Sequence, residues 1–65
     1  MTIEEAKQAL KNGKAISHKY FDDAKYIRYN DKKELIDESG LILDEVDFWR
    51  FRNNIIFMDD WFIKF

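Results

Sequence analysis

Cysteine and proline are absent from the 65-residue chain, and histidine occurs once. Without cysteine the chain forms no disulfide bond and offers no thiolate ligand to zinc. A single histidine is too few for a histidine-rich metal site. We therefore expect neither a metal site nor a bound cofactor.

Long apolar runs are also missing. No stretch approaches the roughly 18 to 20 consecutive apolar residues that a membrane-spanning helix needs. Residues Met1 to Glu5 lack the basic region and apolar run of a signal peptide. We expect a soluble, cytoplasmic protein with no membrane partner.

Neither sign of charge dominates the chain. The 11 lysine and arginine residues and the 13 acidic residues leave a net charge of −2. Binding to a nucleic-acid backbone requires clustered positive charge that neutralises phosphates. We therefore expect no nucleic-acid partner.

Aromatic residues, in contrast, are abundant and concentrated near the C-terminus. They make up 17% of the chain, and seven of the eleven follow residue 47: Phe48, Trp49, Phe51, Phe57, Trp61, Phe62 and Phe65. A chain this short forms one domain, residues 1–65, and buries only about 60% of the surface of its unfolded state. Dense aromatic packing and association of copies are its remaining sources of stability, so we expect a homo-oligomer, a dimer or a tetramer.

The N-terminal segment has a helical pattern. Thr2 and Glu5 have the spacing of a capping box, in which each side chain bonds the backbone N–H of the other residue. Ile3, Ala6 and Leu10 then recur on one helical face. Gly13 follows as a stop signal, because glycine readily takes a positive φ.

After residue 13 the apolar period changes to two, which is typical of strands. The pattern predicts strands at residues 16–21, 26–29 and 35–36, and a fourth that begins at Leu41. Polar turns separate these segments. The prediction is an α+β domain: an N-terminal helix, a small and mostly antiparallel sheet, and a short helix before the last strand.

Residues 45–52 are ambiguous. Asp44 and Asp47 have the spacing that caps a helix, whereas aromatic and β-branched enrichment favours a strand. After this segment, Asn53 and Asn54 can cap a short helical turn that runs through Met58. Residues 61–65 alternate as a last strand.

No catalytic constellation is visible. Adjacent carboxylates occur at 4–5, 22–23, 44–45 and 59–60, where cap and turn roles account for them. His18 lacks a nucleophile motif, and we expect an ordinary position on the sheet surface or against a ligand. Glycine-rich phosphate loops, HExxH and GxSxG are absent. We expect a protein that is not an enzyme.

Basic residues alternate with aromatic residues in two places. Arg28 lies between Ile27 and Tyr29 just after Tyr26, and residues 48–52 read Phe-Trp-Arg-Phe-Arg. Aromatic faces stack on nucleobases and guanidinium groups bind phosphates, so these are the components of a small nucleotide pocket. The alternative is that the rings form the core and the arginines are solvated.

Both ends of the chain resemble the phage Thoeris anti-defence proteins of the second type. Residues 2–14, TIEEAKQALKNGK, are similar to the short opening helix of that family. Near the C-terminus, Trp49 and Trp61 are twelve residues apart, and Asp59-Asp60-Trp61 is similar to the closing motif. The family's basic first strand ends in tryptophan; here the strand lacks arginine and Phe21 takes that position. Ile55 stands where the family commonly has an acid.

The resemblance implies a sponge, an oligomer that binds a cyclic ADP-ribose-type or cyclic-nucleotide immune signal in the bacterial cytoplasm during phage infection. It implies that Phe21 stacks on a base. It also implies ligand contacts around Trp49 and at Arg52, Asn53 and Asn54. Arg28 is added to this set from its position between aromatic rings.

Two other functions fit the same sequence. One is a protein-binding inhibitor of a bacterial defence effector, similar to anti-CRISPR proteins, because a scaffold does not determine its function. A large exposed aromatic face would favour it over a pocket. The other is a structural or host-takeover protein whose C-terminal aromatic residues form a subunit interface.

Overall fold

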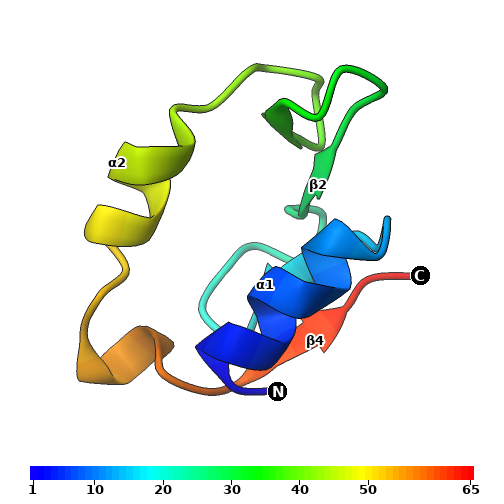
Figure 1. Ribbon diagram of the computed structural model, residues 1–65. Helices are drawn as coiled ribbons and strands as arrows, with labels where there is room; N and C mark the ends of the chain where they lie inside the picture. The colour runs from blue at the N-terminus through cyan, green and yellow to red at the C-terminus, as the bar shows by residue number, and fades with distance from the viewer.

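An antiparallel four-stranded sheet with a helix packed on one face forms the centre of the computed structural model, which describes residues 1–65 (Figure 1). The strand order is β3-β2-β1-β4. The elements in chain order are α1 (Ile3–Lys11), β1 (Ile16–His18), β2 (Ile27–Tyr29), β3 (Leu35–Asp37), α2 (Glu45–Arg50), the 3-10 helix η1 (Ile55–Phe57) and β4 (Trp61–Ile63). The predicted α+β class, with an N-terminal helix and a short helix before the last strand, is confirmed. None of the helices has the length and hydropathy that a bilayer-spanning segment needs.

Helix α1 begins and ends where the sequence predicts. The Glu5 amide donates to the Thr2 hydroxyl at 3.2 Å, and the Thr2 amide donates to the Glu5 carboxylate at 2.9 Å. The predicted apolar face is buried, with Ile3, Ala6 and Leu10 in the core. Gly13 follows the helix with a φ of 83°.

The last strand pairs with the first one and forms an edge of the open sheet beside β1. Ile16 of β1 lies opposite Ile27 of β2 on one side and Ile63 of β4 on the other. Trp61 of β4 also holds the start of the chain, because its backbone amide donates a hydrogen bond to the carbonyl of Met1 at 3.1 Å. The core forms between these strands and α1.

The predicted strand at Leu41 is wrong as a full strand. Only one isolated antiparallel bridge forms there, between Ile36 and Ile42. The Asp37 carboxylate accepts hydrogen bonds from the amides of Ser39 and Leu41. These local bonds hold the segment as a turn against β3 and leave little backbone for a longer ladder.

The strand that composition favours at residues 45–52 is also wrong, because residues 45–50 form helix α2. The Asp44 carboxylate accepts from the Asp47 amide at 3.1 Å, as an N-cap does. Phe48 is the buried residue of the helix. Phe48 and Trp49 can both face inward from one helix, so the cap signal prevails over strand propensity.

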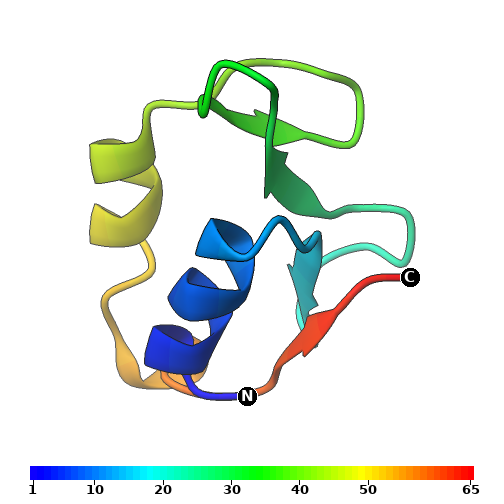
Figure 2. The same ribbon diagram turned by 45° about the vertical axis from the view of Figure 1, so that its right-hand side comes forward.

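Helix α2 lies beside α1 on the side away from the strands in both ribbon views (Figures 1 and 2). Its inner side carries Phe48, which belongs to the core, and Trp49, which packs against the core. Asn54 then caps η1 through a hydrogen bond from the Ile56 amide at 3.0 Å, as predicted. The space between α1 and α2 forms the candidate site.

Candidate ligand-binding groove

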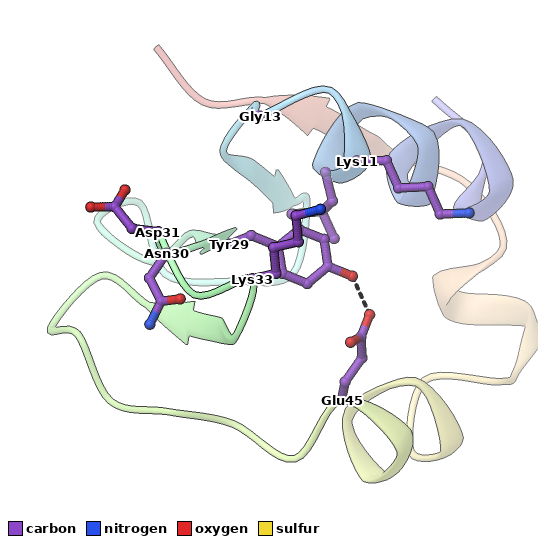
Figure 3. A pocket seen from close by; sticks show the side chains of 8 residues that line it. Lys11, Gly13, Tyr29, Asn30, Asp31, Lys33 and Glu45 are labelled. Carbon is purple, nitrogen blue, oxygen red and sulfur yellow. Dashed lines mark hydrogen bonds between the residues drawn. The ribbon is translucent and has the colours of Figure 1, made fainter.

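Two hollows, of about 550 and 310 Å³, lie next to each other between α1, α2 and β2. Both are lined by Lys11, Tyr29 and Glu45, and we call them together the α1–α2 groove. The larger hollow extends over the β2–β3 turn (Figure 3). The smaller one extends along α1 to Trp49. Ligand sites in proteins commonly have volumes of roughly 300 to 1,000 Å³, so the groove can accommodate a small molecule.

Three lysine side chains line the groove without a salt-bridge partner. Lys7 and Lys11 are one helical turn apart on α1, and Lys33 comes from the β2–β3 turn. The three ion pairs of the structure involve other cations, namely the N-terminal amine, Lys25 and Arg50. Ammonium groups without an ion-pair partner suit an anionic ligand, because charge-assisted hydrogen bonds to phosphate are strong. Three carboxylates, Glu4, Asp31 and Glu45, line the same hollows, so an anion would have to lie against the lysines and away from these acids.

A tyrosine and a glutamate meet where the two hollows join. The Tyr29 hydroxyl donates a hydrogen bond to Oε1 of Glu45, which links β2 to α2 (Figure 3). Burial of the phenol, followed by the hydrogen bond to Glu45 and its negative charge, raises the pKa of Tyr29 to about 12. The phenol is therefore protonated at neutral pH and acts as a donor.

Trp49 supplies an aromatic face at the end of the smaller hollow. Its side chain is half-buried, and the Lys7 ammonium lies 5.0 Å from its ring centroid. On its core side the ring packs against Trp61, with centroids 5.4 Å apart. The indole is thus held in place by its neighbours, and a planar ligand could stack on it once the Lys7 ammonium moves aside.

The predicted ligand contacts Phe21 and Arg52 lie together in an aromatic cluster that also contains Trp61. The Phe21 ring meets Trp61 edge-on at 5.6 Å, and the Arg52 guanidinium lies 5.5 Å from the Phe21 centroid. Arg52 donates from Nη1 to the Phe48 carbonyl at 3.1 Å, while its Nε is buried without a partner. Burial lowers the pKa of Arg52, although no carboxylate pairs with it.

The other three predicted contacts lie apart from this cluster. Arg28 is exposed on β2, on the sheet face opposite the one that carries Ile27 and Tyr29. Asn53 is exposed, and Asn54 is occupied in capping η1. Of the six predicted residues, only Trp49 lines the α1–α2 groove.

The prediction that His18 lies on the sheet surface or against a ligand is wrong. Its side chain is 1% exposed and packs among Phe57, Trp61 and Phe21, with the Phe57 centroid 4.6 Å away. Nε2 lies 2.8 Å from the Asp59 carbonyl, and Nδ1 accepts from the Tyr20 amide at 3.1 Å. Both ring nitrogens are used by the backbone, so the residue is part of the core.

Apart from Trp49, sequence reasoning missed the residues that line the groove. The spacing of Lys7 and Lys11 indicates a shared helical face, and this was the one available signal. Tyr29 and Glu45 are 16 residues apart, and only the fold brings them together. The structure assembles no group of three His, Asp or Glu side chains that could hold a metal ion.

Comparison of the chain with protein-family models, with curated proteins and with solved structures finds no match.

Proposed function

We propose that this protein binds and sequesters a cyclic nucleotide or cyclic ADP-ribose-type signalling molecule, without chemical turnover, in the α1–α2 groove. The observation that carries the proposal is a groove that combines three lysines without an ion-pair partner, Lys7, Lys11 and Lys33, with the ring of Trp49 in its smaller hollow. Phosphates of such a ligand would lie against the lysines. Its base would stack on Trp49.

Sequestration needs tight binding but no reacting group. Holding a signal at nanomolar concentration requires about −12 kcal/mol of binding free energy. Two or three charge-assisted contacts and one stacked base supply that only if most of the ligand is buried. In this proposal the protein acts as a phage anti-defence sponge in the cytoplasm of a bacterial host.

We also propose that the protein is a homo-oligomer. The supporting observation is a run of exposed apolar side chains that we call the α2–η1 apolar face: Val46, Phe51, Ile55, Ile56 and Met58. Ile55 is 87% and Phe51 is 71% exposed. Large apolar side chains exposed in such number on neighbouring segments favour association, because exposed apolar surface commonly marks a protein–protein interface. A second copy would cover it and add walls to the ligand site.

The α2–η1 apolar face also favours a second candidate function, inhibition of a bacterial defence effector through direct protein binding. Exposed Phe51 and Ile55 would then insert into the partner, as apolar anchors do at interfaces. In this alternative the groove stays empty and the lysines serve solubility.

Native mass spectrometry of the full chain separates the two functions. The protein is measured alone and with a panel of cyclic nucleotides and cyclic ADP-ribose isomers. The proposal expects a discrete oligomer that gains one nucleotide mass per groove, and loss of this gain in the Lys7→Ala/Lys11→Ala double variant. The exposed Lys14, which lines neither hollow, gives the matched control Lys14→Ala. An oligomer that takes up no nucleotide, together with capture of a host effector that Phe51→Ser abolishes, would support the inhibitor instead.

A further inference from the structure

One carboxylate, that of Glu45, borders both hollows of the α1–α2 groove. The lining also carries the lysines Lys7, Lys11 and Lys33 and the carboxylates of Glu4, at the smaller hollow, and Asp31, at the larger one. None of these lysines comes within 4.0 Å of the Glu45 carboxylate, so Glu45 forms no ion pair. Its negative charge therefore faces the groove without being neutralised.

One neighbour orients this carboxylate and leaves most of it free. Oε1 accepts from the Tyr29 hydroxyl, and no other protein group bonds the carboxylate. An ionised carboxylate has two oxygens with about four acceptor positions. Oε2 is thus available to a ligand, and Tyr29 fixes its direction (Figure 3).

Such a group discriminates between parts of a ligand. It repels a phosphate placed against it and attracts a hydrogen-bond donor. A ribose diol is a suitable donor, since an acidic side chain on the ribose hydroxyl is a recurrent device in dinucleotide recognition. The lysines on either side would hold the phosphates.

We propose, on the basis of the binding function proposed above, that Glu45 is the specificity-determining residue of the groove and accepts hydrogen bonds from a free ribose diol of the ligand. Tyr29 acts through Glu45 and is a positioning residue. The ligand class is an anion with an unphosphorylated ribose between or beside its phosphates. Sugar-free phosphates bind more weakly because Glu45 repels them.

The test compares two probes by isothermal titration calorimetry: ADP-ribose, which carries ribose diols, and inorganic pyrophosphate, which carries none. Glu45→Gln keeps the size of the side chain and removes its charge. We expect this variant to lose roughly 10- to 100-fold in affinity for ADP-ribose, because a hydrogen bond to a charged group is lost. Its affinity for pyrophosphate should stay the same or increase. Asp47→Asn, on the same helix but outside the groove, should change neither.

The contrary results are distinct. If Glu45→Gln loses the same affinity for ADP-ribose and for pyrophosphate, Glu45 only supports the groove. If its affinity for ADP-ribose is unchanged, Glu45 makes no contact with the ligand. Either result overturns the inference and leaves the proposed binding function standing. Failure of the unmodified protein to bind either probe would overturn the binding function and this inference with it. Tyr29→Phe provides a second measurement, since it should weaken ADP-ribose binding severalfold and leave pyrophosphate binding unchanged.

Discussion

The guanidinium carbon of Arg52 lies 3.9 Å from the centroid of the Phe48 ring. Phe57 also faces it, at 5.7 Å. No carboxylate neutralises the charge, so aromatic faces are its main electrostatic partners. Arg52 thus combines a stabilising contact with a cost, because its buried Nε has no hydrogen-bond partner.

Replacing Arg52 by methionine should lower the free energy of unfolding by less than about 2 kcal/mol. The variant loses a cation–π contact of up to about 2 kcal/mol and the hydrogen bond from Nη1 to the Phe48 carbonyl, worth about 1 kcal/mol, and it also removes an unsatisfied buried donor that costs about 1 to 3 kcal/mol. Arg52→Lys should destabilise more, since an ammonium is more strongly hydrated and cannot spread over the ring. Urea denaturation of both variants provides the comparison. A loss above 3 kcal/mol in Arg52→Met would show that the charge itself holds the cluster.

The same methionine variant tests the ligand contact that the resemblance implies for Arg52. If Arg52 contacts the ligand, the variant stays folded and loses nucleotide affinity. Unchanged affinity would place the ligand in the groove alone, away from the aromatic cluster that contains Trp61.

His18 should prove structural. Its Nδ1 accepts from the Tyr20 amide, so the neutral ring carries its proton on Nε2, which donates to the Asp59 carbonyl. We expect His18→Ala to cost roughly 2 to 4 kcal/mol, because it leaves a cavity and two backbone groups unpaired. Denaturation measures the loss, and nitrogen NMR of the unmodified protein should show the Nε2–H tautomer. A stability change below 0.5 kcal/mol would contradict the core role.

Stability should fall in acid partly through Asp37. The side-chain hydrogen bond from Ser39 and the backbone bonds from Leu41 and Ser39 lower the pKa of this carboxyl. The ordinary carboxyl pKa is about 3.9. Because the pKa of Asp37 is lower in the folded state than in the unfolded state, its ionised carboxylate stabilises the fold fully above the unfolded-state pKa. This stabilisation is lost as the pH falls through the folded-state pKa. Urea midpoints at pH 7 and pH 3 should differ less in Asp37→Asn than in the unmodified protein. An identical pH dependence in both would exclude the role.

Local signals in the sequence were sufficient for part of the fold. The Thr2–Glu5 capping box and Gly13 fix both ends of α1, because the groups involved are near neighbours in the chain. The same holds for Asn54 at η1. Helix α2 was misjudged because β-branched and aromatic content reports burial as much as strand structure.

The candidate site was less accessible to prediction. Lys11 comes from α1, Tyr29 from β2 and Glu45 from α2, and no short motif joins them. Their proximity depends on the position of α2, which is held by the burial of Phe48, the packing of Trp49 and the hydrogen bond between Tyr29 and Glu45. The groove thus depends on long-range contacts that no local pattern reports.

The helical assignment of residues 45–50 leads to a test at its cap. Asp44→Ala removes the acceptor of the Asp47 amide and should cost about 1 kcal/mol, the usual effect of losing an N-cap. Asp23→Ala is the matched control, since the Asp23 side chain makes no hydrogen bond and no ion pair. Thermal unfolding should separate the two variants. Equal melting temperatures would argue that the tertiary contacts of Phe48, Trp49 and Glu45 hold α2 without help from the cap.

Trp49 offers a direct signal of groove occupancy. Its ring is half-buried under the Lys7 ammonium, whereas Trp61 is 1% exposed and its indole N–H donates to the Phe57 carbonyl at 2.8 Å. A base that stacks on Trp49 should displace Lys7 and change the fluorescence of this ring, while the buried Trp61 stays constant. Titration with ADP-ribose should therefore give a saturable change that Trp49→Phe removes, with at least a fivefold loss of affinity, because a stacked base contributes about 1 to 3 kcal/mol. A fluorescence change that persists in Trp49→Phe would indicate that the ligand binds near Phe21 and Trp61 and not in the α1–α2 groove.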